Sequence, residues 1–367
     1  MKFLRLAFYV LIAQLVLSGC AGEAVEETSS SSSSEINFDA YVGRNASTRS
    51  DVTDIDFLKS GEWNAGFGVF ARYGNTHLMD TEHVTWNKDQ NHWEYTNTRF
   101  WPSNGTVDFY AFAPHSTEPK LVSPKDNGKY AIEEPNSTYI YFPSNMSPVD
   151  LVWANAKGRT KTNERVKFTF KHALARLSFD ITANQDLEEN GAVIKVKEVR
   201  LYGADENKGI FIMAGYLNLE NGAWTLADKG IRWFYTWTPT GKVDGKNDEQ
   251  LKIDGPIYKL SATQLDNNTP SIANEKDSYI FIIPQTKNEP FYLAITYTVQ
   301  QGNFEETVTV KKNLLDVLDK SGAPNPSFTF EKGKAYVFHL ILSLDPVDFS
   351  VTVDGKKRDE VTDEITI

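Results

Sequence analysis

Short segments in which apolar and polar residues alternate recur along most of this 367-residue chain. The clearest are residues 36–42, 107–112 and 166–170. Successive side chains of a β-strand point to opposite faces of a sheet, so a period of two predicts half-buried strands. Further strands are predicted at residues 67–71, 139–142, 194–201, 279–283, 291–299, 307–311, 335–344 and 349–353. Residues 313–319 carry the one candidate helical turn.

The composition is that of an all-β protein with many turns. Aromatic residues make up 13% of the chain and charged residues only 24%, with 23 glycines and 15 prolines. Proline stands where several strands end, at Pro114, Pro143 and Pro284, and its missing N–H does least harm there. Asn-Gly or Asp-Gly pairs predict tight turns at residues 127–128, 221–222, 244–245, 254–255 and 354–355.

The N-terminus has the pattern of an export signal. Lys2 and Arg5 precede an apolar run at residues 6–17, which is too short to span a bilayer comfortably. The run ends in Leu-Ser-Gly-Cys, a lipobox, and this predicts that Cys20 receives a diacylglycerol and becomes the acylated N-terminus. The alternative is an ordinary secretory signal with a chance cysteine. We therefore assign residues 1–19 to a lipoprotein signal peptide.

Residues 20–35 read as a flexible tether, because glutamates and a run of serines offer almost nothing to bury. The chain has a single cysteine, so an intramolecular disulfide, thiol catalysis and a cysteine metal site are all excluded. The net charge of −11 becomes two units more negative when Lys2 and Arg5 are removed. Such a surface disfavours nucleic acid and anionic headgroups as partners.

The remaining 330 or so residues exceed a typical domain and predict two β-sandwiches in tandem. A polar stretch at residues 161–164 separates two apolar blocks and gives the boundary. The predicted N-terminal sandwich covers residues 36–163. The C-terminal sandwich covers residues 164–367.

No pattern in the chain indicates an enzyme. GxSxG, a phosphate-binding glycine loop and HExxH are all missing. His172 lies between apolar neighbours and is interpreted as a buried, hydrogen-bonded histidine. His77 and His83 are the pair that could meet on a loop, yet two histidines alone are a weak metal signal. We expect no catalytic residue, no metal site and no cofactor.

Two aromatic clusters offer a ligand-binding alternative. Trp233, Tyr235 and Trp237 would share one face of a strand and could stack on a sugar ring. Trp86, Trp93, Tyr95 and Trp101 crowd a second region. Aromatic residues also dominate sandwich interiors, so both clusters are interpreted first as core.

The order of several motifs resembles the fimbrillin-like proteins, the type V pilins and pilus accessory proteins of Bacteroidales. The motifs are the lipobox, INFDAYV (36–42) followed by STRS (47–50), GFGVFA (66–71), VDFYAFAP (107–114), YFPSN…VDLVWA (141–154) and FTFKHALARLSFDI (168–181). The resemblance weakens after about residue 203. It implies two transthyretin-like β-sandwich domains and a cell-surface or fimbrial location.

The resemblance also implies an assembly mechanism. A trypsin-like surface protease would cut after Arg49, with Arg44 as the competing site, and remove the lipid together with the first strand. That strand would carry the inward residues Ile36, Phe38, Ala40 and Val42. A C-terminal donor segment of another pilin subunit, within residues 346–367, would then fill the groove. Its apolar residues of matching parity are Val347, Phe349, Val351, Val353, Val361, Ile365 and Ile367.

Two alternatives stay open at this stage. The charged tail after Val353 suits an accessory or anchor subunit that keeps its lipid in the outer membrane and retains its first strand. The second alternative is a monomeric surface lipoprotein adhesin that binds a host or bacterial glycan or protein through an aromatic face.

Overall fold

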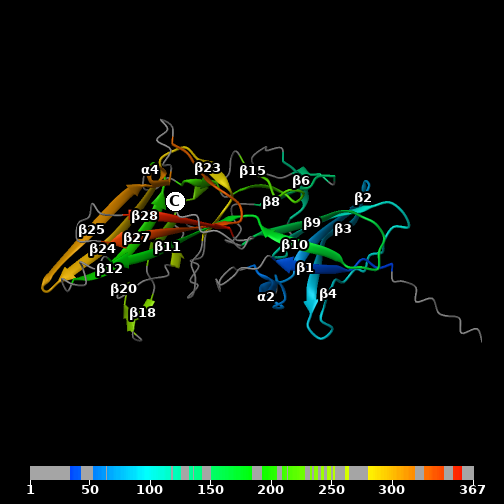
Figure 1. The fold of residues 1–367 in the computed structure, drawn as a ribbon, viewed down its shortest axis with the longest axis horizontal. Coiled ribbons are helices and arrows are strands. Elements are labelled where there is room, and N and C mark those ends of the chain that lie inside the picture. The colour runs from blue at the N-terminus through cyan, green and yellow to red at the C-terminus, as the bar shows by residue number, and fades with distance from the viewer. Residues whose placement is uncertain are drawn as a thin grey trace, which may run out of the picture.

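The computed structural model shows a chain built almost entirely of β-strands, which confirms the predicted fold class (Figure 1). It describes residues 34–42, 53–62, 64–116, 119–124, 132–134, 136–142, 150–183, 192–204, 209–212, 214–227, 232–233, 235–238, 241–243, 246–248, 251–252, 261–263, 280–318, 326–342 and 350–357. Its helices there are α2 (Ile55–Leu58) and α4 (Leu314–Leu318), the latter at the predicted helical turn. Within these ranges no helix has the length and apolarity to cross a membrane.

A seven-stranded sheet forms the N-terminal lobe, with the strand order β1-β10-β9-β5-β2-β3-β4. Its strands are β1 (Phe38–Val42), β2 (Phe67–Tyr73), β3 (Thr76–Asn87), β4 (His92–Glu94), β5 (Val107–Ala113), β9 (Val152–Arg159) and β10 (Val166–His172). The two edge strands, β1 and β4, lie close to each other, so the sheet curls around its own core. Phe67, Phe109, Phe168 and Trp93 fill that core.

A five-stranded sheet covers the outer face of this curled sheet, in the order β15-β14-β8-β6-β7. Its strands are β6 (Leu121–Ser123), β7 (Ile132–Glu133), β8 (Tyr139–Phe142), β14 (Gly215–Asn218) and β15 (Trp224–Leu226). Tyr110 and Phe112 of β5 belong to one buried cluster with Ile140 of β8 and Leu217 of β14. The seven-stranded sheet therefore carries apolar side chains on both of its faces.

Two further sheets enclose the core of the C-terminal lobe. One has the order β22-β11-β27-β28, and the other has the order β21-β17-β12-β24-β25 with β20 beside β12. Their strands are β11 (Ala175–Ala183), β12 (Val193–Tyr202), β17 (Tyr235–Thr238), β20 (Leu251–Lys252), β21 (Ser261–Thr263), β22 (Ile280–Ile282), β24 (Tyr292–Gln301), β25 (Phe304–Asn313), β27 (Lys334–Leu342) and β28 (Ser350–Lys357). Leu177, Leu201, Ile295 and Phe338 are among the buried residues between them.

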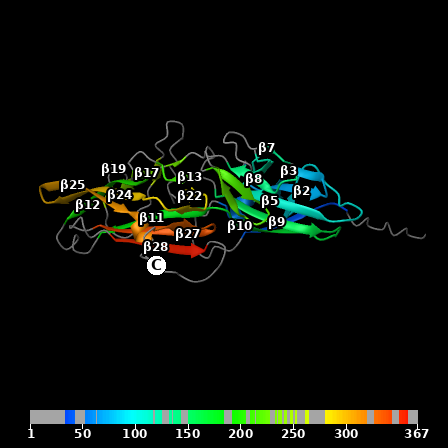
Figure 2. The same ribbon diagram turned by 90° about the horizontal axis from the view of Figure 1, so that it is seen from above.

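Three two-stranded ladders complete this lobe. They pair β13 (Phe211–Ile212) with β16 (Arg232–Trp233), β18 (Gly241–Val243) with β19 (Lys246–Asp248), and β23 (Gln285–Lys287) with β26 (Phe328–Phe330). The two lobes follow each other along the long axis of the molecule (Figures 1 and 2).

The strand pairing does not change at the 163/164 boundary predicted from the sequence. β10 begins at Val166 and pairs with β1 and β9 of the N-terminal lobe, so the chain passes to the other lobe between His172 and Ala175. The hairpin of β14 and β15 then returns and pairs with β8. A polar stretch marks a surface turn, whereas lobe membership is set by which sheet edge a later segment can bury itself against.

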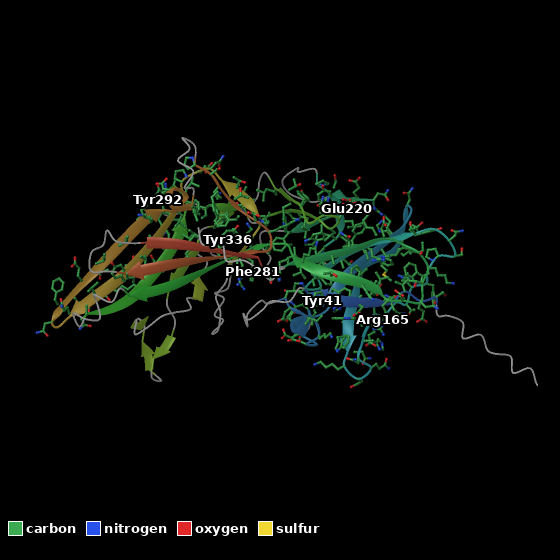
Figure 3. All side chains as sticks on the ribbon, in the orientation of Figure 1. Tyr41, Arg165, Glu220, Phe281, Tyr292 and Tyr336 are labelled. Carbon is green, nitrogen blue, oxygen red and sulfur yellow. The ribbon has the colours of Figure 1, made fainter. Side chains whose placement is uncertain are left out.

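The buried cluster that contains Phe112 also includes residues of the C-terminal lobe, and it joins the two lobes. Leu174, Phe281 and Ile283, which flank or belong to C-terminal-lobe strands, pack in the same cluster as Phe112 and Trp153 of the N-terminal lobe. Phe281 is labelled at this junction in Figure 3. Trp224 of the returning hairpin also donates a hydrogen bond from Nε1 to the carbonyl of Ala173, at 2.7 Å.

Two of the predicted turns fall on described residues, and they have different outcomes. Gly222 follows Asn221 in the turn of the β14–β15 hairpin with φ +68°, which confirms that prediction. Asp354 and Gly355 instead lie inside β28, opposite Val337 and Tyr336 of β27. The prediction of a turn at these two residues was therefore wrong. The local preference of an Asp-Gly pair is small compared with a complete ladder of backbone hydrogen bonds.

Gly222→Ala is expected to destabilise the protein more than Gly302→Ala, by about 1–3 kcal/mol. Both glycines have positive φ, so both variants carry backbone strain. Of these two positions, only at Gly222 does an added Cβ collide with a ring, that of Trp153, whereas the space at Gly302 is open. Urea unfolding followed by tryptophan fluorescence measures the difference. Equal midpoints for the two variants would contradict the hairpin contact.

Candidate functional site: the groove occupied by the first strand

β1 is an edge strand that pairs in parallel with β10. The register joins Phe38 to Val166, Ala40 to Phe168 and Val42 to Phe170. β1 thus closes the edge of the curled sheet, next to β4. The alternation seen in the sequence is confirmed as a strand with one buried face.

The inward face of β1 fills the core of the N-terminal lobe. Ile36, Phe38 and Val42 are buried, and Ala40 is partly buried against the same cluster. The ring of Phe38 is 1% exposed and lies within 5.6–6.4 Å of four aromatic rings, measured between centroids. Those rings belong to Phe67, Tyr95, Phe109 and Phe168. Such geometries are the favourable tilted, stacked and edge-on arrangements.

Hydrogen bonds hold the residues just before β1 in place. The Ile36 N–H donates to the Arg99 carbonyl at 2.8 Å, and the Trp101 N–H donates to the Ser34 carbonyl at 2.6 Å. The Tyr95 hydroxyl donates to the Ile36 carbonyl at 2.6 Å and accepts the Arg99 N–H at 3.1 Å. Burial raises the pKa of Tyr95, which keeps this hydroxyl protonated as a donor. The loop at residues 95–101 therefore holds the strand from the side opposite β10.

The outward face of β1 is polar and accessible. Asp39 lies opposite Lys167 of β10, and Tyr41 lies opposite Thr169 with 48% of its surface exposed. Figure 3 labels Tyr41 near one end of the β1–β10 ladder and Arg165 near the other. The two faces of β1 thus differ sharply in burial, and only the inner face contributes to the core.

The described part of the predicted donor segment is β28. This strand pairs antiparallel with β27 over its whole length, at the edge of a C-terminal-lobe sheet. Val351 and Val353 lie opposite Leu340 and Phe338. Val347, Phe349, Val361, Ile365 and Ile367 lie outside the described residues, as do Cys20, Arg44 and Arg49.

The aromatic positions proposed for glycan stacking do not form one continuous strand. Trp233 lies in β16, opposite Phe211, whereas Tyr235 and Trp237 lie in β17, opposite Leu201 and Val199 of β12. Their placement in two separate sheets removes the single shared strand face expected from the sequence. Glycan binding there stays a prediction.

The second aromatic cluster is core, as interpreted from the sequence. Trp93 and Trp101 are buried, and Trp86 and Tyr95 pack against the same cluster. These four side chains line the interior that receives β1.

His172 is buried at the end of β10. Its Nδ1 lies 3.1 Å from Asp150 Oδ2, and both side chains are almost fully enclosed. A buried charge or polar ring needs such a partner, so the pair fixes the end of the strand against the segment before β9. This agrees with the interpretation of His172 as a buried, hydrogen-bonded residue.

The histidines that were considered for a metal are arranged differently from the expectation. His77 and His83 both lie on β3 rather than on a loop. The ring of His83 stacks on His115 with 3.6 Å between centroids, and its Nε2 lies 2.7 Å from the Ala65 carbonyl oxygen. In the described ranges, no group of three His, Cys, Asp or Glu residues is placed to hold a metal ion.

The chain has an all-β fold, and the comparisons give its family. The sequence pattern of the fimbrillin-like family matches residues 48–355, so the chain is a member of that family and the predicted resemblance is confirmed. It is 26% identical over 383 residues to fimbrium subunit Fim1C of Phocaeicola vulgatus, covering 93% of each chain.

A solved structure has the same fold. The crystal structure of a fimbrial protein from Bacteroides vulgatus superimposes with a TM-score of 0.58 at 20% sequence identity. The match covers 88% of this chain and 99% of that chain. At this identity the likeness shows the fold alone.

Phe38→Ala is expected to lower the free energy of unfolding by about 3–5 kcal/mol, because the core loses a fully buried ring. Tyr41→Ala, an aromatic truncation on the outer face of the same strand, is expected to cost less than about 1 kcal/mol. Chemical denaturation of the intact chain measures both. Comparable losses would show that the inner face of β1 contributes little to the core.

Stability is expected to decline between about pH 6.5 and pH 4 through His115. Burial, followed by the neighbouring His83, lowers the pKa of His115 from 6.5 to about 4. In that window the unfolded chain binds a proton that the folded chain does not, so unfolding becomes easier as the pH falls. The partial exposure of the ring reduces the effect to about 1–2 kcal/mol.

The measurement is a pH series of urea unfolding for the protein and for His115→Phe, which has no proton to bind at that position. The variant should show a smaller decline between pH 6.5 and pH 4. Parallel curves would contradict the assignment, and His92→Phe, at a part-exposed position on β4, serves as the matched control.

Proposed function

We propose that this protein is a fimbrial subunit that assembles by strand replacement and mediates adhesion from the cell surface, and that it is not an enzyme. Membership of the fimbrillin-like family and similarity to a fimbrium subunit support a structural partner role with other pilin subunits. In this proposal the chain is exported as a lipoprotein, held in the outer membrane through Cys20 until it is cut after Arg49 or Arg44.

The observation that carries the proposal is the match between the first strand and the C-terminal segment. Residues 36–42 read INFDAYV and residues 347–353 read VDFSVTV. In both segments the first, third, fifth and seventh residues are apolar. The third residue is phenylalanine in both, and the seventh is valine in both. A segment with this pattern presents apolar side chains to the groove beside β10 at the same four positions as β1.

The edge position of β1 supports the proposed replacement. Because β1 is an edge strand, its loss leaves the order of the other six strands intact. Its loss also exposes the rings around Phe38 and the outer edge of β10. Refilling the groove with four apolar side chains stabilises by roughly 6–10 kcal/mol gross. It also pairs an edge that would otherwise recruit strands indiscriminately.

The common pattern also gives a direction and a register. Phe349 of the incoming chain takes the place of Phe38, Val351 that of Ala40, and Val353 that of Val42. The new strand then runs parallel to β10, as β1 does. To donate it, a subunit gives up the ladder between β27 and β28. The exchange is head to tail and open-ended, so it extends a filament.

The experiment treats the purified mature protein with a trypsin-like protease. Intact mass and N-terminal sequencing locate the cut, and native gels follow assembly. We expect a start at Ser50, or at Asn45 if Arg44 is the site, together with a concentration-dependent ladder. Arg49→Ala should block both events, and Arg44→Ala is its matched control, with the roles reversed if the start is Asn45.

A donor variant tests the register. Phe349→Ala should abolish the ladder without changing the cut, because the groove loses its largest side chain. Thr352→Ala, of the opposite parity, should assemble normally. A ladder that survives deletion of residues 347–367 would overturn the strand-replacement proposal. So would native fimbriae whose subunits begin at acylated Cys20 and keep residues 36–42.

A further inference from the structure

β25 forms an open edge of the C-terminal lobe, far from the groove of β1. It pairs with β24 along its whole length, from Phe304 opposite Gln301 to Asn313 opposite Tyr292. In the part of the chain that the structure describes, no strand pairs with its other side. The β24–β25 hairpin reaches one end of the long axis (Figures 1 and 2). Residues 304–307, Thr309 and Lys311 are exposed, including 63% of Phe304.

The charges on β25 are ordered along the strand. Glu305 and Glu306 stand at its start and Lys311 and Lys312 near its end, with Thr-Val-Thr-Val between them. A second copy running antiparallel brings its lysines to the first copy's glutamates, at both ends of the contact. A parallel copy in register would place like charges side by side, which is destabilising. The strand is thus complementary to itself in one direction only.

The two faces of β25 restrict the register. Val308 and Val310 pack against the core of the lobe, whereas the Thr309 hydroxyl meets that of Thr296 at 3.0 Å on the other face. Two antiparallel copies related by a two-fold axis normal to the sheet keep their faces aligned. Opposed residues must therefore come from the same face. With Thr309 on the axis, Glu306 lies opposite Lys312 of the second copy.

The lysines and glutamates differ in how far they are already engaged. The Lys311 ammonium lies over the rings of Tyr292 and Tyr202, at 4.1 and 5.2 Å from their centroids. Neither Glu306 nor Lys312 has an ion-pair partner among the described residues. The register with Thr309 on the axis pairs these two residues and sets Val308 opposite Val310.

We propose that the β25 edge is a docking surface for a second copy of this chain, which continues the sheet across a two-fold axis. The proposal is independent of strand replacement, because β25 belongs to neither the groove nor the donor segment. The contact is confined to one ten-residue strand. It is therefore smaller than a standard interface and weak for one pair of copies. Repetition of the edge along a filament would multiply the effect through effective concentration.

The test is charge exchange between Glu306 and Lys312, followed by sedimentation equilibrium of the mature chain carrying Cys20→Ser and left uncut. The unsubstituted edge should self-associate, more weakly as salt is raised. Glu306→Lys alone and Lys312→Glu alone should each weaken association about tenfold or more, because symmetry introduces the repulsion twice. An equimolar mixture of the two single variants should associate, since each supplies what the other lacks. The double exchange should also restore association.

Matched charge reversals at exposed Lys161 and Glu164, in the other lobe, should leave association unchanged. A protein that stays monomeric at the highest concentration would overturn the proposal and show that the charges only protect the edge from pairing. Equal association by the single variants and their mixture would overturn it as well.

A crosslink tests the register in the same background. Thr309→Cys places two thiols at the axis and should give a disulfide-linked dimer under mild oxidation. Glu305→Cys places the two thiols about eight residues, or about 27 Å, apart along the strands, so this variant should not form a disulfide-linked dimer. Crosslinking by Glu305→Cys alone would overturn the antiparallel register.

Discussion

The ladder between β1 and β10, with the ring of Phe38 beneath it, is the contact on which the N-terminal lobe depends. The curled sheet closes only because its edge strand lies beside β4 and fills the interior with one apolar side chain in every two. In the proposed assembly, this strand is the point of exchange. A segment with apolar residues at the same alternate positions can make the same backbone hydrogen bonds and fill the same space in the core. Burial makes β1 necessary to the lobe, and its edge position is what the proposed replacement depends on.

The two lobes are joined by packing as well as by the chain, which passes between them more than once. The β14–β15 hairpin adds strands to the sheet that covers the N-terminal lobe, and Phe281 and Ile283 contribute to the same buried cluster. Separating the lobes would expose that cluster to water. In the proposed filament, load would pass from the groove in one lobe to the donor strand in the other, and this packing would share it with the chain connections between the lobes.

The sheet edges of this molecule differ in whether another strand covers them. The outer side of β10 is covered by β1, and that of β27 by β28. The edge at β25 carries ordered charges and no neighbour among the described strands. Backbone groups at an open edge can pair with another strand, so a charged edge such as that of β25 restricts which strand can pair there. In the assembly proposed above, the filled edges take part in strand replacement along a filament, and the β25 edge takes part in contact between copies.

The sequence by itself determined which segments are strands and which face of each is apolar. The parity of residues 36–42, the short helix α4, the turn at Gly222 and the core placement of Trp93 and Trp101 follow from patterns confined to a few neighbouring residues. The motifs quoted above also sufficed for the family. Such features are local, because alternation is imposed by the geometry of a single strand.

Only the tertiary structure decided which strands meet. The parallel pairing of β1 with β10, the clasp by Tyr95, and the return of residues 215–226 to the first lobe have no local signature. Neither does the separation of Trp233 from Tyr235 and Trp237 into two sheets. Pairing across long stretches of chain is settled by which apolar faces can be buried together once the intervening loops are closed. That global competition also decides which edges stay open.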